Sequence, residues 1–525
     1  MPAQALGLGG LWLGGLLGCA AKTAPETALP AQGQAPAGTL ILAHTNDLHA
    51  HYLPEAAEWR EDQALLGGMV AIDAELRTLE RRFGEQSVLY LDAGDVLTGT
   101  PLMELEVGGV SGGAMALLLD AIGLDGWVPG NHEFDRGFDH AQSFVDLGQA
   151  PTLSTNLRAP CGSDPLACAP ALAGTEPWRI YTVNGLKVGV FGLTTSGMAH
   201  LTDDATLARM EVLGPAPAAQ QAVQALEPQV DLVVALTHIG LENDRLLARE
   251  VQGIDLVVGG HSHTRMEAAE RVGDTWIVQA GSYGRLLGIA EVEVADGGIQ
   301  ALRWQAEELD PQALPMPADP EVLALVEGWR EELDARFTQP AGQATAPMTR
   351  LGGGETSMGR WCADVVRQAG EADVGLYNAG GIRADLAAGP VTVGDLYEVF
   401  PFGNEVVVFE ATGADLLAMM LSTALSEVED NRGTLQWSGV RFSWQVRLGA
   451  PEIVEAQVGG QPLDLARRYR VATIDFVAAQ WERNLGVQPQ AVVGTGRKAL
   501  DAAVAVAQLG PISPPADPRM SRVGQ

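Results

Sequence analysis

Five short blocks rich in histidine, aspartate and asparagine punctuate the first half of this chain, and each follows an apolar run typical of a buried strand. The blocks hold five of the nine histidines. Oxygen and imidazole ligands gathered at strand ends are what a hydrolytic site with two metal ions requires. In chain order the blocks read T-N-D-L-H at 45–49, D-A-G-D at 92–95, G-N-H-E-F-D at 130–135, T-H-I-G at 237–240 and G-G-H-S-H at 259–263.

The segment from residue 39 to about residue 294 alternates between strand-like and helix-like patterns. Amphipathic stretches at 68–82, 113–122 and 243–251 separate the apolar runs. Such alternation predicts a layered α/β fold with much parallel pairing, in which ligands collect beyond the carboxyl ends of the strands. The clearest predicted strands are residues 40–43, 87–91, 188–193, 232–236, 254–258 and 276–279.

A chain of 525 residues is too long for a single hydrophobic core, so two domains are expected. We predict a first domain over 39–310 and a second α/β domain over 346–509. Residues 311–345 read as a linker, because a cluster of prolines precedes a charged helical stretch. The tail at 510–525 is expected to be irregular, and residues 1–38 to be a signal followed by a flexible linker.

The N-terminus carries an apolar stretch at 11–17 that ends in L-L-G-C, which is too short to span a membrane. It looks like a bacterial lipoprotein signal with Cys19 as the lipidated residue, although no Lys or Arg precedes Cys19. The protein would then be exported to the cell envelope, periplasmic or outer-membrane, and touch the membrane only through this anchor. A disordered tail with a chance cysteine is the alternative.

The net charge of −33 argues against duplex nucleic acid as a partner. An anionic substrate would have to be held by metal ions and a few arginines. Export also changes the interpretation of the cysteines. Cys161 and Cys168 lie in a loop-like stretch where a short disulfide is plausible, and Cys362 falls in a helical pattern as a small buried residue.

Each block alone has an ordinary explanation. Asp47 and Asp95 follow strands, where an aspartate usually belongs to a turn or caps a helix, and His238 and His261 fit histidines at buried strand ends. The joint occurrence of five blocks in one domain favours the metal site.

The order and wording of the blocks resemble the 5′-nucleotidase and UDP-sugar hydrolase family of calcineurin-like metallophosphoesterases. The likeness runs from about residue 40 to residue 497 and has a second leg, N-A-G-G-I-R at 378–383 and G-D-L-Y-E-V-F-P-F-G-N at 394–404. It implies a four-layer α/β sandwich followed by a smaller α/β substrate-binding domain.

Carried over by position, the resemblance implies two divalent metal ions, of zinc, manganese, magnesium or cobalt. One would be held by Asp47, His49 and His263, and Asp95 would bridge both. The second would also be held by Asn131, His238 and His261. Many relatives have Gln or Asn where this chain has His263, and the histidine remains a competent ligand.

Two cations about 3.5–4 Å apart neutralise a phosphoryl oxygen and lower the pKa of a water between them, which then attacks phosphorus in line with the leaving oxygen. His132 and Asp135 resemble the family's catalytic dyad: His132 would stabilise charge on the transferring group, and Asp135 would orient it. His132 as a further metal ligand is the alternative.

Substrate recognition is expected in the second domain. Arg383 offers a planar fork for phosphate or ribose oxygens. By resemblance, Phe402 and Phe476 would sandwich a nucleobase, although a lone Phe usually belongs to a core. Two glycines allow close approach of the backbone or simply make a turn. The candidate substrate residues are Asn378, Gly380, Gly381, Arg383, Phe402 and Phe476.

The chain departs from its relatives at two places. Relatives carry an arginine before E-T-x-x-G-N, whereas this chain has G-G-G-E-T-S-M-G-R, with Arg360 in place of Asn; Arg350 could substitute if the loop folds back. Relatives follow the second Phe with G-G-D-G, whereas Phe476 is followed by V-A-A-Q-W-E-R-N, where Glu482 is the candidate replacement for Asp.

These observations predict a metal-dependent hydrolase that releases phosphate from nucleotides, with 5′-nucleoside monophosphates as the first expected substrates. The alternatives are a UDP-sugar hydrolase, a 2′,3′-cyclic nucleotide phosphodiesterase with 3′-nucleotidase activity, and a non-enzymatic surface-binding protein. A thiosulfohydrolase is more distant, because the G-N-H-E-F-D block is intact. Catalysis would need the domains to close across the helix at 321–337.

Overall fold

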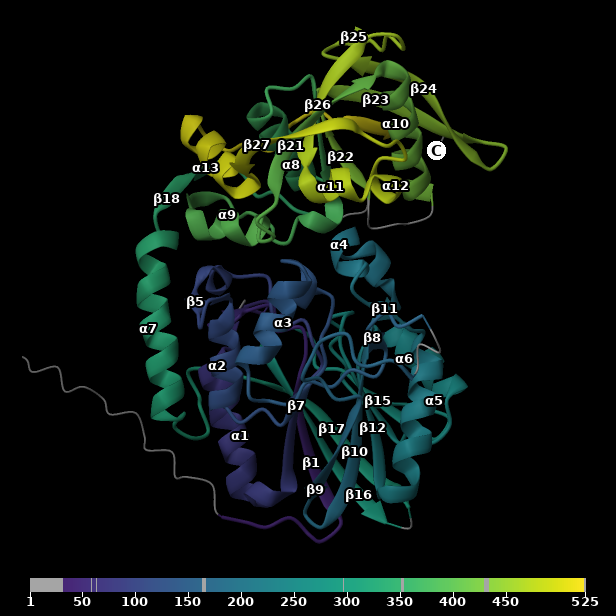
Figure 1. The fold of residues 1–525 in the computed structure, drawn as a ribbon. Helices are drawn as coiled ribbons and strands as arrows, with labels where there is room; N and C mark the ends of the chain where they lie inside the picture. The colour runs from purple at the N-terminus through teal and green to yellow at the C-terminus, as the bar shows by residue number, and fades with distance from the viewer. Residues whose placement is uncertain are drawn as a thin grey trace, which may run out of the picture.

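The computed structural model describes residues 32–523 except 58, 63, 163–166, 296, 351–353 and 429–433. Figure 1 shows two domains, one above the other, with a long helix running along one side between them. The predicted lipidation residue, Cys19, lies outside the described residues. Among the helices of the described part, none is long and apolar enough to cross a membrane.

The first domain is built on two sheets. The strand order of one is β17-β16-β1-β4-β7 and that of the other is β14-β15-β13-β12-β10-β9. Strand β1 pairs with β4, and β12 pairs with β10 and β13, all in parallel, as the alternating pattern predicts. The main strands are β1 (Thr39–Thr45), β4 (Val88–Asp92), β7 (Gly126–Trp127), β10 (Leu186–Thr194), β12 (Leu232–His238), β13 (Leu256–Gly259), β15 (Thr275–Val278), β16 (Leu286–Ala295) and β17 (Gly298–Glu308).

The two sheets pack face to face, and helices cover their outer faces. Leu42 and Val234 belong to the core between the sheets. Ile72 and Leu118 pack on the outside of the first sheet, and Val223 packs on the second. This α/β/β/α order confirms the predicted sandwich. The covering helices are α1 (Met69–Phe83), α2 (Gly113–Ala121), α5 (Pro215–Leu226) and α6 (Leu241–Glu250).

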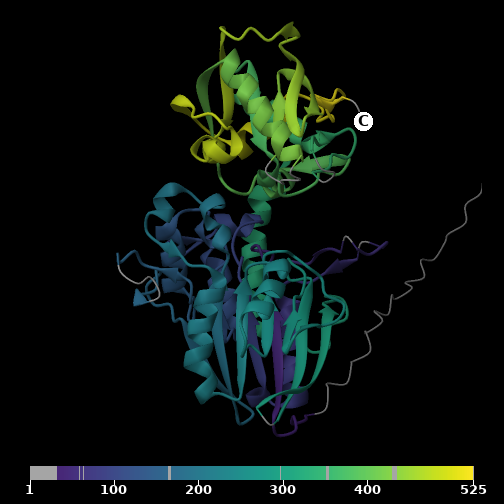
Figure 2. The same cartoon turned by 90° about the vertical axis from the view of Figure 1, so that its right-hand side faces the viewer.

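The carboxyl ends of the parallel strands point toward the second domain (Figures 1 and 2). Strands β1 and β12 are buried along their whole length, and the predicted ligands stand at or just beyond the carboxyl ends of such strands, as His238 does at the end of β12. All five polar blocks therefore meet at one edge of the sandwich. The strand before the third block, β7, is only a two-residue strand and was not among the predicted strands.

The second domain contains a mixed sheet with the order β22-β19-β26-β21-β27 and a smaller sheet, β25-β24-β23-β28. Helix α8 has its buried face, which includes Trp361 and Val365, against the main sheet. The elements that bear on the site are β19 (Val374–Asn378), β21 (Glu405–Thr412), β23 (Val440–Arg447), β26 (Arg468–Ile474), β27 (Gln490–Lys498), α8 (Ser357–Ala369), α9 (Val393–Val399), α10 (Gly413–Val428), α11 (Asp475–Ala479) and α12 (Trp481–Asn484).

Helix α7 (Pro320–Phe337) lies where the linker helix was predicted. Its N-cap is Asp319, whose side chain accepts from the backbone N–H of Glu321. Buried residues Val322 and Val326 pack into the core of the first domain, and the Phe337 ring meets the Tyr397 ring of the second domain at 5.5 Å. The helix is therefore fixed to the first domain and touches the second at its carboxyl end.

The C-terminal tail is more ordered than predicted. Ile512 is buried, and the strand β28 (Met520–Arg522) adds to β23 in parallel. The Arg519 guanidinium donates to Asp364 at 2.7 Å and to the Trp437 carbonyl at 2.6 Å. The expectation of an irregular tail missed this because the anchoring acceptors lie on distant segments of the chain.

The cysteines follow the sequence expectations. Cys161 and Cys168 form a disulfide, and Cys362 is a free, fully buried thiol in α8.

Candidate metal centre

Seven side chains from the five polar blocks converge at the edge of the first domain that faces the second. Three sets of ligand atoms lie close enough together to hold a metal ion. The sets are Asp47, His49 and His263; His49, Asp95 and His132; and Asp95, His238 and His261. Six of the seven predicted ligands thus occur in these sets, and the seventh, Asn131, offers an amide oxygen.

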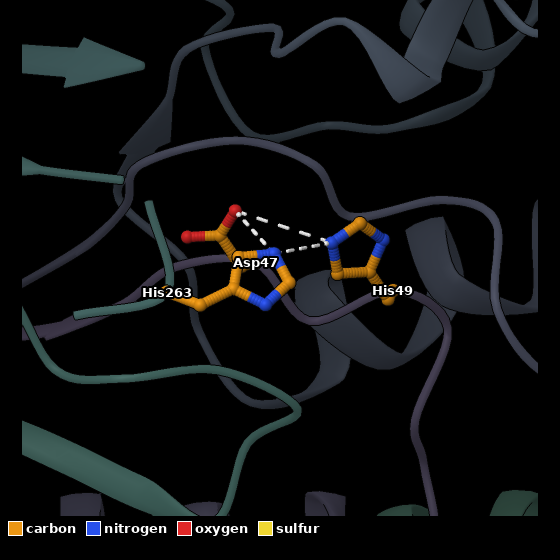
Figure 3. Close-up of side chains that lie close together, drawn as sticks. All are labelled: Asp47, His49 and His263. Carbon is orange, nitrogen blue, oxygen red and sulfur yellow. Dashed lines mark hydrogen bonds and ion pairs between the residues drawn. The ribbon is translucent and has the colours of Figure 1, made fainter. Parts of the chain in front are cut away.

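The first set joins the loops after β1 and β13 (Figure 3). Nε2 of His263 lies 3.3 Å from Oδ1 of Asp47 and 3.1 Å from Nε2 of His49. Nε2 of His49 is 4.0 Å from the same carboxylate oxygen. His263, the position at which the chain departs from many relatives, is therefore in place to act as a ligand.

The set of Asp95, His238 and His261 adjoins the first set through Asp95. Oδ2 of Asp95 lies 3.0 Å from Nε2 of His238 and 3.9 Å from Nε2 of His49. Nδ1 of His261 lies 3.3 Å from Nε2 of His238. One carboxylate thus stands between the two sets, which is the arrangement that a bridging ligand requires.

The residues present fit two divalent cations. Oδ1 of Asn131 is buried and has no hydrogen-bond partner among the described residues, a cost that a cation would remove. Imidazole nitrogen together with carboxylate and amide oxygen suits zinc, manganese and related ions.

Hydrogen bonds to backbone carbonyl groups determine which ring nitrogen His49 and His238 present to the metal site. Nδ1 of His49 donates to the Thr98 carbonyl at 2.9 Å, and Nδ1 of His238 donates to the Ala93 carbonyl at 2.7 Å. With Nδ1 carrying the proton, Nε2 is free as a lone-pair donor. Such outer hydrogen bonds fix both the tautomer and the ring orientation.

The backbone around the centre is strained. Five of the predicted ligands have positive φ angles, a region that costs a non-glycine residue roughly 1–2 kcal/mol. Tight turns immediately after buried strands require this conformation if the side chains are to point back toward one another. The residues are Asp47 (53°), His49 (49°), Asp95 (55°), His261 (75°) and His263 (53°).

Glu133, which the sequence reasoning did not single out, holds the second and third blocks together. Its buried carboxylate accepts from the backbone N–H groups of Gly130 (2.6 Å), Val96 (2.8 Å), Leu97 (3.1 Å) and Asp95 (3.2 Å). Burial raises the pKa of Glu133 to about 7, and Asp95 adds to this shift. The signal in the sequence was its position between Asn131 and Asp135.

Burial and the neighbouring charges set the protonation of the ligands. Burial lowers the pKa of His49 well below the ordinary value, and burial with the nearby His238 lowers that of His261 to about 4. Both rings are therefore neutral at pH 7, which is the form that binds metal. Burial would also lower the pKa of His238, but the Asp95 carboxylate outweighs it and raises that pKa to about 10, so a metal ion must displace a proton there.

The predicted dyad is formed. Nδ1 of His132 donates to Oδ2 of Asp135 at 2.7 Å, and its Nε2 lies 4.0 Å from Oδ2 of Asp95. The His132 ring also stacks on Phe402 of the second domain, with centroids 5.8 Å apart. The His132 ring also belongs to one of the three sets, with His49 and Asp95, so it also lies within reach of a metal ion.

A cavity of about 320 Å³ between the domains brings the dyad together with the predicted substrate residues. All six of them line it, and Arg383 also lies over the Phe402 ring. Oδ1 of Asn378 is buried without a partner among the described residues, so it is an acceptor left for a ligand. The lining combines Asn131, His132 and Asp135 with Asn378, Gly380, Gly381, Arg383, Phe402 and Phe476.

The structure places the residues at the two departures from the family differently. Arg350 lines a second cavity, of about 260 Å³, beside His49 and Arg383, so the chain does fold back there. Glu482 is exposed and does not line either cavity, so it does not replace the missing Asp as predicted. Its neighbours Arg483 and Asn484 face the larger cavity instead, because the turn is wound into α12.

Arg360, where relatives have Asn, serves the fold. Its guanidinium pairs with Glu355 at 3.1 Å and donates to the Pro515 carbonyl of the tail at 3.0 Å. His200, Asn404, Arg483 and Asn484 also line the larger cavity and were not predicted; Asn404 ends the block at 394–404, whereas the other three stand in no distinctive motif.

Comparisons with known proteins agree with this geometry. Residues 40–265 match the calcineurin-like phosphoesterase family, and residues 337–485 match the 5′-nucleotidase C-terminal domain family. A 5′-nucleotidase of Vibrio cholerae is 26% identical over 84% of this chain and 84% of its own. A trifunctional nucleotide phosphoesterase of Bacillus subtilis is 29% identical over 84% of this chain, which spans about a third (32%) of that protein.

Solved structures give the same result for the whole chain. The 5′-nucleotidase precursor of Thermus thermophilus is 27% identical, with a TM-score of 0.80 over 93% of this chain and 100% of that one. The sulfate thiohydrolase SoxB of the same organism, 21% identical with a TM-score of 0.74, shares the fold. The chain therefore belongs to the family of 5′-nucleotidase-type metallophosphoesterases, in which a calcineurin-like phosphoesterase domain is joined to a 5′-nucleotidase C-terminal domain.

Proposed function

We propose that this protein hydrolyses the phosphate ester of nucleotides, with 5′-nucleoside monophosphates as substrates. The observation that carries the proposal is the continuity of one cavity from the dyad His132–Asp135 to Phe402 and Phe476. A phosphoryl group bound beside the dyad leaves a nucleoside-sized space next to it.

The metal ligands in this proposal are those expected from the sequence. Asp47, His49 and His263 hold one divalent ion, Asn131, His238 and His261 hold the other, and Asp95 serves both. The ions, when bound, neutralise the phosphoryl oxygens and make water a better nucleophile at neutral pH.

His132 has the geometry of a charge stabiliser. Burial opposes its protonation, but Asp135 and Asp95 outweigh burial, and its pKa is raised above the ordinary histidine value. Asp135 thus favours the protonated ring, whose Nδ1–H is directed at that carboxylate and whose Nε2–H would donate to an oxygen of the transferring phosphoryl group. Asp135 fixes the tautomer and the ring orientation.

The second domain supplies the nucleoside pocket. Phe402 and Phe476 give flat apolar faces for a base, and Arg383, which has no acceptor among the described residues, reaches toward phosphate or ribose oxygens. Closure of the two domains about the carboxyl end of α7 would complete the pocket. The proposal includes a first domain over residues 39–310 and a second domain over residues 346–509.

A panel of nucleotides tests the function. With manganese or zinc present, the purified protein should release phosphate from adenosine and uridine 5′-monophosphates, and His132→Ala should lower the rate by about 10²–10³-fold while binding the same metal content. Wild-type turnover in His132→Ala would remove the dyad from the mechanism. If the protein released phosphate from none of the nucleotides in the panel, nucleotides would be refuted as the substrate class.

Longer nucleotides, such as UDP-sugars, are the second candidate. The 260 Å³ cavity shares Arg383 with the larger one and combines Arg285 and Arg350 with Glu55, Glu398 and Tyr283. A nucleoside monophosphate leaves this space empty, whereas a group attached to the far side of the phosphoryl would enter it. Comparing UDP-glucose with uridine 5′-monophosphate in the panel separates the two candidates.

We also propose export to the cell envelope, with lipidation of Cys19 as the anchor. The disulfide between Cys161 and Cys168 supports an oxidising compartment. Metabolic labelling with a radioactive fatty acid, compared between wild type and Cys19→Ala, tests the anchor.

A further inference from the structure

The nucleoside cavity is lined by two adjacent residues of α12, Arg483 and Asn484, that have no part in the metal centre or the dyad. Both approach the larger cavity that also contains Phe402 and Phe476. The position and chemistry of these two side chains bear on which base the cavity accepts.

Each side chain has part of its hydrogen-bonding capacity committed. Nη1 of Arg483 donates to the His200 carbonyl across the domain interface at 2.5 Å, and its other guanidinium N–H groups meet no acceptor in the described part of the chain. Nδ2 of Asn484 donates to the Gln480 carbonyl at 3.0 Å. That bond fixes the amide orientation. Asn484, a residue only 5% exposed, lines the cavity, and its Oδ1 meets no donor among the described residues.

The pair therefore presents a donor next to an acceptor. Hypoxanthine, guanine and uracil carry the complementary pair on one edge, a carbonyl oxygen beside an N–H group. Adenine and cytosine carry the reverse, an amino group beside a bare ring nitrogen. An arginine cannot accept from that amino group, because a guanidinium has donors only. A buried mismatch of this kind costs about 1–3 kcal/mol.

We propose that Arg483 and Asn484 read the carbonyl/N–H edge of the base, so that the protein prefers oxo-base nucleotides to their amino counterparts. This inference rests on the proposed nucleotidase function and adds a base preference to it. Arg483 donates to the exocyclic oxygen, and Oδ1 of Asn484 accepts from the ring N–H. A site built to hydrogen-bond one edge rejects a base that lacks it.

Inosine and adenosine 5′-monophosphates test the proposal, because they differ only at this edge. For the metal-loaded wild type, kcat/KM for the inosine nucleotide should exceed that for the adenosine nucleotide by about tenfold or more. Arg483→Met, which keeps the length and removes the donors, should lower this ratio and leave only the part that Asn484 contributes.

Gln480→Ala is the matched control. Gln480 makes the neighbouring interdomain hydrogen bond, to the Thr202 carbonyl at 2.7 Å, without lining the cavity. Its loss should lower kcat/KM for both nucleotides equally and leave the ratio unchanged. If Arg483 acted only on domain closure, its loss would also lower kcat/KM equally for both nucleotides. An unchanged ratio of the two kcat/KM values in Arg483→Met therefore overturns the proposal.

Calorimetric binding of inosine and adenosine to the metal-loaded protein separates base reading from hydrolysis. Tighter binding of inosine, by a margin that shrinks in Arg483→Met, supports the base preference, even if no nucleotide is hydrolysed and the proposed function fails. Equal binding, tighter binding of adenosine, or no binding of either nucleoside refutes it.

Discussion

The two regions that face each other across the domain interface are built differently. The predicted metal ligands Asp47, Asp95 and His238 are almost completely buried. Hydrogen bonds with the backbone hold Asp95 and His238 in place. The predicted substrate residues Phe402 and Phe476 are only partly buried. The first region is a rigid set of turns from one domain, whereas the second depends on how α11 and α12 are wound.

This contrast separates chemistry from selection. A strained and buried cluster tolerates few substitutions, so the blocks keep the residues that the chemistry needs. The partly exposed cavity tolerates changes such as the V-A-A-Q-W-E-R-N segment, which alter the groups offered to a base. We therefore expect changes in the first region to affect the rate for every substrate and those in the second to affect substrate choice.

The largest effect is expected for Asp95→Ala. Loss of the carboxylate between both ligand sets should lower kcat by about 10³-fold or more for all nucleotides, because several kcal/mol of charge stabilisation depends on both ions. Metal analysis should show fewer ions per chain, and circular dichroism should show the fold retained. Asp274→Asn, at a fully exposed aspartate, is the control. Retention of two ions and full activity in Asp95→Ala would break the assignment of the first region.

Glu133→Gln should have the next largest effect. A glutamine keeps the shape but offers one acceptor oxygen in place of two, so the amide N–H groups of the two ligand loops lose partners. We expect activity to fall by about 10–100-fold, as for other residues that orient ligands, with an equal effect on all substrates. Steady-state kinetics on two nucleotides measures this. Glu250→Gln, at an exposed position, should behave as wild type.

Phe476→Ala should act on selection alone. Losing one aromatic face should raise KM for a nucleotide by about tenfold, since stacking contributes roughly 0.5–1.5 kcal/mol beyond area burial. Hydrolysis of ribose 5-phosphate, which has no base, should be unchanged. Phe476→Leu separates stacking from apolar burial. An equal loss for ribose 5-phosphate would show that this residue supports the fold instead of the base.

The smallest effect is expected on stability and concerns Glu398 in the second cavity. Burial raises its pKa to about 8, with further contributions from Glu55 and Asp395. Because the folded pKa is raised above the unfolded value, the stability it contributes is present below about pH 4.5 and is lost as pH rises through 8. Between about pH 5 and 9, wild type should therefore lose stability that Glu398→Gln keeps. Thermal unfolding at both pH values measures the difference, and parallel curves would contradict it.

Much of the fold followed from local patterns. Apolar runs of strand length, separated by amphipathic stretches, predicted β1, β4, β10, β12, β13 and β15 within two residues at each end. The two-residue β7 and the long β16 and β17 were missed, since β7 is too short for any periodicity and the other two form an antiparallel pair with partly exposed stretches. The tail was missed because its partners are distant in the sequence.

The sequence by itself determined which side chains could form the centre, because parallel strands place their carboxyl ends together and the polar blocks follow those ends. Only the tertiary structure decided what depends on contacts between distant segments. It placed Glu133 under two loops, turned Glu482 outward, and brought Arg483 and Asn484 to the cavity. The position of a strand along the chain follows from a local pattern, whereas the direction of a side chain in a wound turn is set by what packs against it.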